Sequence, residues 1–316
     1  PQARDPAAGD LRHRRLGLSG LKHADLMRRV PAPPRRGAAP ACALAVALFA
    51  ALLAALPIAR ADQPLWEAGG GAAVTHFPDY RGSDESRAYL LPLPYFVYRG
   101  EVLRVTRDGV QAQLVETRRF EFDISAAGSV PVDSSKNRAR TGMADLKPTL
   151  EIGPLARFHL WQTADRVFDL ELRVPLRVSL TYGGNAGVRD IGWSSTPNLN
   201  LDWKPRRFGD RMNVGLLVGP LYGDRRLNGY FYDVTAAEAT PQRPAYRSRG
   251  GYGGWQAIAA ISHRVDKLWL GGFVKFDSLA GAAYADSPLV TRRSHVSGGF
   301  GVAYVFAEST RRVARD

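Results

Sequence analysis

The stretch Phe168–Tyr182, with the sequence FDLELRVPLRVSLTY, decides the fold. Every second residue in it is apolar, and the residues between are charged, polar or proline. Successive side chains of a strand point to opposite sides, so this period of two predicts one apolar and one polar face. At about 3.3 Å per residue, its fifteen residues reach roughly 50 Å. A tilted membrane strand needs only ~9–11 residues, so this stretch is long enough to cross a membrane. The stretch therefore favours a transmembrane β-strand, and a long strand in a soluble sheet is the alternative.

The N-terminal part of the chain has the features of a cleaved leader. The apolar run Ala41–Leu56 follows several arginines and precedes the small-residue motif Ala59–Ala61. This order is typical of a Sec-type signal peptide, and it predicts cleavage between Ala61 and Asp62. The run is short for a membrane-spanning helix, and a retained helical anchor is the alternative. Met27 precedes the arginines and is the expected true start.

Much of the basic charge belongs to this leader. Residues 1–61 hold ten of the 43 Lys and Arg residues and three of the 30 Asp and Glu residues, so the formal charge of +13 falls to +6 without them. The charge therefore gives no support to nucleic-acid binding. Cys42, the one cysteine, also lies in the leader, so the exported part has no disulfide framework. No later segment approaches the ~18 consecutive apolar residues of a transmembrane helix.

The same alternation recurs after the leader and predicts about twelve strands, or ten if the hairpin around Asp108 and Gly109 is a loop decoration. The expected strands are residues 66–76, 89–98, 102–106, 110–116, 120–130, 146–160, 168–182, 193–204, 212–222, 252–264, 268–279 and 296–306. Apart from that hairpin, long and short gaps alternate, as do the extracellular loops and periplasmic turns of outer-membrane barrels. We therefore predict an all-β protein, an antiparallel up-and-down transmembrane β-barrel over residues 62–306 with a short tail at 307–316.

Charged residues on the polar face of these strands predict a charged lumen. The members of this lumen charge cluster are Lys147, Glu151, Arg157, Asp169, Glu171, Arg173, Arg177, Asp202 and Lys204. Buried charges are costly unless paired, so opposite charges from neighbouring strands could pair and fill the lumen. If they stay hydrated, the barrel is a small pore. Side chains fill the inside of a barrel of about eight strands, whereas a barrel of about sixteen strands leaves a channel. A barrel of about twelve strands lies between these sizes, so the strand count does not decide between a filled lumen and a pore.

The sequence offers little sign of an enzyme. It has no G-x-S-x-G, H-E-x-x-H or P-loop pattern. His159 shares the lumen-facing parity of its charged neighbours, and we interpret it as a polar filler, with a general base as the alternative. Asp79, Asp84 and Glu85 could bind calcium, but a solvated loop is the preferred interpretation. We therefore expect no catalytic residues, no cofactor and no metal.

Short motifs occur along residues 64–306 in an ordered series. Their residues are Pro78, Asp79, Tyr80, Gly82, Ser83, Tyr98, Arg99, Gly100, Phe231, Tyr232, Asp233, Val234, Asp286, Ser287 and Pro288, followed by the closing segment Tyr304–Phe306. As an ordered set they resemble the MipA/OmpV family of outer-membrane proteins. The closing segment resembles the terminal-strand signal by which outer-membrane barrels are recognised for insertion. That signal usually ends a chain, whereas ten residues follow it here.

The resemblance implies an outer-membrane barrel in a Gram-negative cell, in contact with outer-membrane lipid. The family's name-giving member is a scaffold that links a murein-degrading transglycosylase to a murein-synthesising penicillin-binding protein. A scaffold or adaptor for cell-wall enzymes is therefore the expected function. Other members are described as porin-like, so a passive pore for small solutes is the alternative, and a barrel-embedded hydrolase is the least favoured. The family has no catalytic residues to carry over, and it implies no cofactor and no nucleic-acid partner.

Overall fold

The computed structural model describes residues 63–99, 103–106, 109–112, 115–116, 119–183 and 187–313. The chain divides into two compact units, and these residues belong to the second, Leu53–Asp316. The predicted start at Met27 and the cleavage site between Ala61 and Asp62 lie outside the described residues, as does Gly100 of the family motifs.

Antiparallel strands make up most of the described chain. The strands of the main sheet are β2 (Trp66–Pro78), β3 (Ser86–Arg99), β4 (Leu103–Thr106), β5 (Gly109–Ala112), β6 (Val115–Glu116), β7 (Phe120–Ser129), β8 (Thr149–Gln162), β9 (Phe168–Tyr182), β10 (Val188–Ser195), β11 (Asn198–Trp203), β12 (Met212–Gly223), β13 (Gly251–Val265), β14 (Leu268–Ser278) and β15 (Ser294–Glu308). The described part of the chain is thus all-β, with α2 (Arg225–Tyr232) as its one α-helix. None of its helices is long and apolar enough to cross a membrane.

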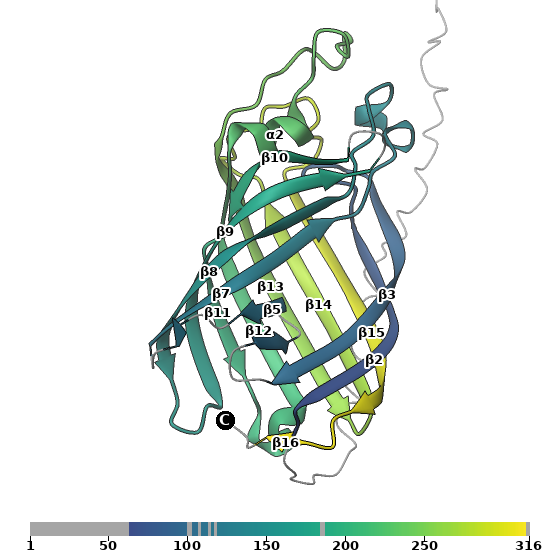
Figure 1. Cartoon of the computed structure of the whole chain (residues 1–316). Coiled ribbons are helices and arrows are strands. Elements are labelled where there is room, and N and C mark those ends of the chain that lie inside the picture. Colours follow the sequence, from purple (N-terminus) through teal and green to yellow (C-terminus); the bar gives the residue numbers. More distant parts are fainter. Residues whose placement is uncertain are drawn as a thin grey trace, which may run out of the picture. The chain divides into compact units, whose positions relative to one another are not determined.

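Most strands that follow one another in the chain are neighbours in the sheet; β5 with β6 and β10 with β11 are the exceptions. The order is β5-β4-β3-β2-β15-β14-β13-β12-β10-β9-β8-β7-β6, and β11 also pairs with β9 and β12. The last long strand, β15, pairs with the first, β2, so the sheet curves back on itself (Figure 1). Its described edges are β5 and β6, and Cα atoms of β5 approach those of β7 within 8 Å.

Most expected strands are observed with ends shifted by one to three residues, two are observed as two strands each, and proline explains two of the differences. The strand expected at 193–204 begins earlier and is interrupted, so that β10 and β11 lie on either side of Pro197, which has no N–H to donate. The strand expected from Leu146 begins only after Pro148. The strand expected at 110–116 appears as β5 and β6, two separate short strands.

The two faces of the sheet differ as the period of two predicts. On the convex side of β9, Leu176 and Val178 are about half exposed. On its concave side, Glu171 and Ser179 are buried. Because each pleat turns successive side chains to opposite faces, the apolar residues of one strand line the outside and its polar residues the inside.

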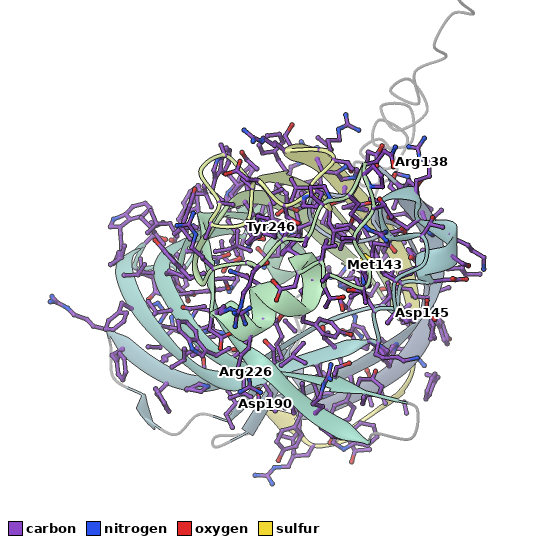
Figure 2. The ribbon with its side chains drawn as sticks, turned by 90° about the horizontal axis from the view of Figure 1, so that it is seen from above. Arg138, Met143, Asp145, Asp190, Arg226 and Tyr246 are labelled. Atoms are coloured by element: carbon purple, nitrogen blue, oxygen red, sulfur yellow. The ribbon has the colours of Figure 1, made fainter. Side chains whose placement is uncertain are left out.

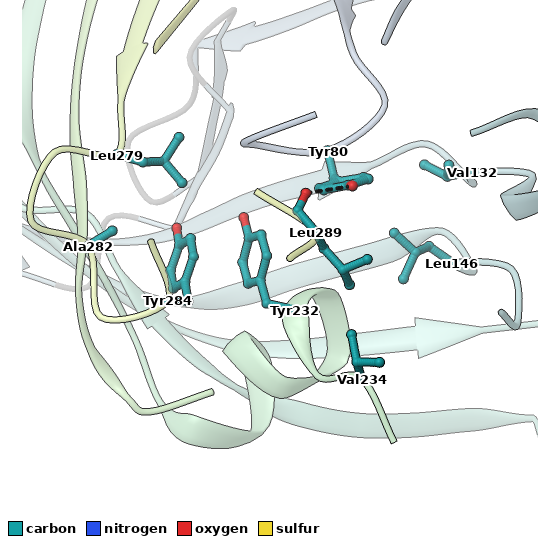
Figure 3. Packing of buried hydrophobic residues seen from close by; sticks show 9 residues of the cluster. All are labelled: Tyr80, Val132, Leu146, Tyr232, Val234, Leu279, Ala282, Tyr284 and Leu289. Carbon is teal, nitrogen blue, oxygen red and sulfur yellow. Dashed lines mark hydrogen bonds between the residues drawn. The ribbon is translucent and has the colours of Figure 1, made fainter. Parts of the chain in front are cut away.

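The two ends of the sheet are built differently. At one end, which we call the helix end, α2 and four loops, at residues 79–85, 130–148, 224–250 and 279–293, pack together. Their core is Tyr80, Val132, Leu146, Tyr232, Val234, Leu279, Ala282, Tyr284 and Leu289 (Figure 3). We call this assembly the loop layer.

At the opposite turn end, the connections are short. Turns at 163–167 and 266–267 and the 3-10 helix Arg206–Arg211 join neighbouring strands. The short strands β1 (Gln63–Pro64) and β16 (Arg312–Val313) pair with each other, so the segment that follows the closing strand is tied to the start of the described chain. Ser309 N–H donates to Trp66 O at 2.9 Å in support of this pairing.

Candidate functional site

Charged side chains of β7, β8, β9 and β11 meet on the concave face near the turn end. We call this group the concave network; its members are Glu121, Asp123, Arg157, His159, Asp169, Glu171, Arg173 and Asp202. It includes five residues of the predicted lumen charge cluster. The network also contains Glu121, Asp123 and His159, which that cluster omitted although strand parity assigns them to the same face.

Two arginines of the network are paired with carboxylates. Arg157 Nε lies 2.9 Å from Asp123 Oδ2, and both side chains are less than a tenth exposed. Arg173 joins two strands, because its Nε donates to Glu171 at 2.6 Å and its Nη2 to Asp202 on β11 at 3.2 Å. Pairing of this kind offsets the cost of removing these charges from water.

His159 lies among three carboxylates. Its Nε2 is 3.2 Å from Glu121 Oε1, and its Nδ1 is 3.1 Å from Asp169 Oδ1 and 3.6 Å from Glu171 Oε1. The pairing of β8 with β9 places His159 opposite Glu171. After His159 the register shifts by one residue, so that Trp161 pairs with Leu170. Such an irregularity bends a strand and redirects its side chains.

The other members of the predicted cluster do not join the network. Glu151 accepts a hydrogen bond from Ser194 at 2.6 Å. Arg177 donates to the hydroxyl groups of Ser125 and Thr196. The two lysines lie just outside the strands, since Lys147 precedes β8 and Lys204 follows β11, and both are exposed.

The opposite concave wall combines one buried ion pair with an apolar patch. Glu67 accepts from Tyr95 Oη at 3.1 Å and pairs with Arg264. Tyr95 belongs to a buried cluster with Val97, Ala303 and Val305, against which Trp269 packs. The Trp269 ring covers Gly271, where a Cβ would collide with it, so glycine allows the ring to lie flat on the sheet.

Arg81 ties the loop layer to the sheet. Its Nε lies 3.0 Å from Asp277 Oδ1, and its Nη1 donates to Gly253 O at 2.8 Å and to Tyr284 Oη at 3.1 Å. Burial alone lowers the pKa of Arg81, but the neighbouring Tyr284 and Asp277 outweigh burial and raise it. The backbone oxygen of Arg81 accepts from Tyr232 Oη at 2.8 Å, which connects the first loop to α2.

The acidic residues of the first loop are paired with basic side chains. Asp79 accepts from Arg87 Nε at 2.7 Å and from Asn137 Nδ2 at 2.9 Å, and Asn137 also donates to Ser83. Arg138 lies 2.9 Å from Asp84 and 2.8 Å from Glu85. Asp84 and its partner Arg138 are exposed to solvent, as expected of a solvated loop, and these contacts also join the loops at 79–85 and 130–148.

Residues of the later family motifs lie in the same layer. Ser287 Oγ donates to Tyr232 O at 2.8 Å, so the motifs around these two residues are in contact. Phe231 O accepts from Arg140 Nη1 at 3.1 Å, and Asp233 accepts from Ser248 N at 2.6 Å. Val234 is buried. Motifs from distant parts of the chain therefore converge at the helix end.

The remaining motif residues shape the chain around these contacts. Pro78 ends β2, and Gly82 has a φ of +96°, a conformation that favours glycine. Gly82 O accepts from the N–H groups of Thr291 and Arg292, each at 2.9 Å. Tyr98 and Arg99 end β3 at the turn end, where they pair with β4. The remaining two, Asp286 and Pro288, flank Ser287, and Asp286 lies 3.4 Å from Arg293.

The helix α2 lies inside the curve of the sheet when the molecule is viewed from above (Figure 2). Asp224 caps its N-terminus by accepting from Leu227 N at 2.8 Å. Arg226 holds it against β10, because its Nη1 donates to Asp190 Oδ2 at 3.0 Å and its Nη2 to Asp190 O at 2.7 Å. The helix is therefore fixed to the sheet by contacts at its first turn.

A groove opens between two turns at the turn end. It is lined by Thr163, Ala164, Asp165, Val167, Phe168, Trp203, Pro205 and Arg207. The rings of Phe168 and Trp203 stack with centroids 5.9 Å apart and planes 2° apart, which forms its apolar wall. Arg207 is exposed and supplies a positive charge beside Asp165 in the same lining.

A known protein family matches most of this chain. The profile of a family described as MltA-interacting protein MipA matches residues 70–306, which include most of the described strands. No curated protein matches the chain. The matched residues contain the loop layer and the concave network.

Proposed function

Because the chain belongs to the MltA-interacting protein MipA family, we propose that it is an outer-membrane β-barrel that acts as a scaffold for murein enzymes. In this proposal the sheet closes where β5 approaches β7, and the closed barrel spans the membrane. The partners are a murein-degrading transglycosylase, which the family description names as MltA, and a murein-synthesising penicillin-binding protein.

The convex face supports the membrane location. Its large exposed apolar residues include Val74, Leu90, Phe96, Leu150, Ile152, Leu176, Val178, Leu216, Val218, Val274, Val296 and Phe300. They come from strands between β3 and β8 in the sheet order, whereas soluble proteins rarely expose contiguous apolar patches of more than a few hundred Å². Hydrocarbon chains of lipid would cover such a surface without cost.

The loop layer favours a scaffold over a pore. Its loops share a buried core across the helix end, and Arg81 binds that core to the wall. The concave charges are also largely engaged with one another, as in Arg157 with Asp123 and Arg173 with Glu171. An open channel would instead need a hydrated path between these groups. We therefore propose a barrel whose outer end is plugged.

We place the partner contact at the turn end. Short turns of outer-membrane barrels face the periplasm, where murein and its enzymes lie. The groove between residues 163–167 and 203–207 offers a stacked aromatic wall and the cation of Arg207, a combination that is enriched in protein interfaces. Exposed aromatic and arginine side chains supply most of the affinity of many interfaces.

Binding of purified MltA to this protein in lipid nanodiscs tests the proposal. We expect saturable binding that Arg207→Glu weakens at least about 5-fold, since loss of an important interface arginine costs more than about 1 kcal/mol. The matched control is Arg247→Glu, an exposed arginine in the loop at 224–250, which should leave binding unchanged. Absence of binding, or equal loss in both variants, would contradict the proposed contact.

A passive pore is the second candidate function. It is favoured by the excess of carboxylates in the concave network, where five acidic residues accompany two arginines and one histidine. Single-channel recording in a planar bilayer separates the two functions. The plugged scaffold predicts no steady conductance, and a steady, cation-selective conductance would favour the pore.

A further inference from the structure

We propose that His159, Asp169 and Glu171 form a binding site for one divalent transition-metal ion on the concave face. The three residues lie on β8 and β9 near the turn end. His159 stands opposite Glu171 in the pairing of β8 with β9, and Asp169 is two residues from Glu171 on the same face of β9. The site is independent of the scaffold function, because it rests on side-chain geometry alone.

The potential ligand atoms already lie close to one another. His159 Nδ1 lies 3.1 Å from Asp169 Oδ1 and 3.6 Å from Glu171 Oε1, and one ligand atom from each residue fits within 4.8 Å of the others. Ligands placed about 2.0–2.2 Å from a zinc ion, at tetrahedral or octahedral angles, are separated by roughly 3–3.6 Å. An ion could therefore enter by replacing a proton between these atoms, with little movement of the strands.

Each proposed ligand is also held by a second group through its other polar atom. Asp169 Oδ2 accepts from Gln162 Nε2 at 2.9 Å, and Glu171 Oε2 accepts from Arg173 Nε at 2.6 Å. The second imidazole nitrogen, Nε2, faces Glu121 Oε1 at 3.2 Å. The atoms that remain, Nδ1, Oδ1 and Oε1, are the ones that converge. Metal-binding histidines and carboxylates are typically oriented by outer partners in this way.

The charge balance of the concave network favours a cation. Five carboxylates are joined by the network's contacts to the guanidinium groups of Arg157 and Arg173 and to one imidazole. Three of these carboxylates, on Glu121, Asp169 and Glu171, lie within 3.6 Å of the imidazole of His159. Their negative charge would attract a divalent ion, and the low exposure of Glu171 would strengthen the attraction.

The donor set defines the class of ion. One imidazole nitrogen and two carboxylate oxygens suit zinc, manganese, cobalt or nickel, whereas calcium and magnesium prefer oxygen ligands alone. Water would fill the remaining positions. The ion would connect β8 to β9 and so act as a clamp on the wall.

Titration of the untagged, chelator-treated protein with Zn²⁺ tests this site by calorimetry in detergent. We expect one ion bound per chain. Glu121→Gln, which removes the negative charge of an outer partner, should weaken binding about 10-fold. His159→Gln, which removes the imidazole, and Asp169→Asn, which removes a ligand's negative charge, should weaken it more than Glu121→Gln does. His76→Gln, a histidine exposed on the convex face, should leave it unchanged.

The competing explanation is an imidazolium ion held between carboxylates without any metal. It predicts no saturable binding, or binding that is equal in the unmodified protein and in His159→Gln, and either result would overturn the proposal. Folding of every variant is checked by its heat-dependent mobility in gel electrophoresis. For folded variants, the visible absorption of bound Co²⁺ gives a second readout, which should be present with His159 and absent with His159→Gln.

Discussion

The ring of Tyr232 stacks on the ring of Tyr284, with centroids 3.9 Å apart and planes 11° apart. The first ends α2 and the second lies in the loop at 279–293, so the stack joins two loops that approach from different strands (Figure 3). Both rings are buried. With Arg81 beside them, they form the centre of the loop layer.

Truncation of this stack should loosen the loop layer. Tyr232→Ala removes a buried ring and the hydrogen bond to Arg81 O, and we expect a loss of about 3–5 kcal/mol, as for other large-to-small changes at buried aromatic sites. Limited proteolysis at 224–250 and urea unfolding measure the effect. Tyr182→Ala, at an exposed ring on the convex face, is the control. Equal sensitivity of both variants would show that the stack does not hold the layer.

Alkaline pH should also open the layer. Burial raises the pKa of Tyr80 and Tyr232 above the ordinary value of 10.0, so the folded layer favours the neutral phenols. Stability from these groups is therefore complete below pH 10.0 and is lost as pH rises toward their folded pKa values. In a spectrophotometric titration, these tyrosines should ionise only as the loops become protease-sensitive. One reversible transition near pH 10.0 for all tyrosines would contradict this assignment.

The lipid face of β9 can be tested at Leu176, which is about half exposed. Leu176→Arg should reduce the free energy of folding into lipid vesicles by about 2–4 kcal/mol, because it moves a charge into hydrocarbon. Leu176→Phe keeps the side chain apolar and should have little effect. If both variants fold equally well, this residue does not face lipid.

The concave network should be sensitive to the loss of Arg173. Arg173→Gln leaves Glu171 and Asp202 without this partner, and we expect a destabilisation of about 3 kcal/mol, near the lower end for a broken buried pair. Arg177→Gln is the matched change, since Arg177 donates to hydroxyl groups, and about 1 kcal/mol is expected there. Denaturant titrations compare the two. A smaller loss for Arg173→Gln would indicate that water hydrates these carboxylates.

The orientation in the membrane predicts where trypsin cuts intact cells. Arg247 and Arg249 are exposed at the helix end, and Arg166 and Arg207 are exposed at the turn end. We expect cleavage at the first pair in intact cells and at the second pair only after the outer membrane is permeabilised. Mass spectrometry of the fragments identifies the sites. The reverse order would place the loop layer in the periplasm.

The amino-acid sequence by itself determined the faces of the wall. In β9 the alternation separates Leu176 from Arg177 in any antiparallel sheet, because the pleat turns neighbouring side chains to opposite sides. The same parity identifies Arg157 and Glu171 as concave residues, and it could have included Glu121 and Asp123. Proline marks some limits as well, since Lys147 precedes Pro148 and Lys204 precedes Pro205 at strand ends.

Only the tertiary structure decided which groups meet. The contacts of His159 with Glu171 and Asp169 depend on the register in which β8 pairs with β9, which alternation does not encode, because sliding one strand changes every pairing across the two strands. The loop layer depends on contacts between distant segments, such as Arg81 with Asp277 and Tyr232 with Tyr284. Local sequence sets the direction of a side chain, whereas its partner depends on how strands and loops far apart in the chain are aligned in space.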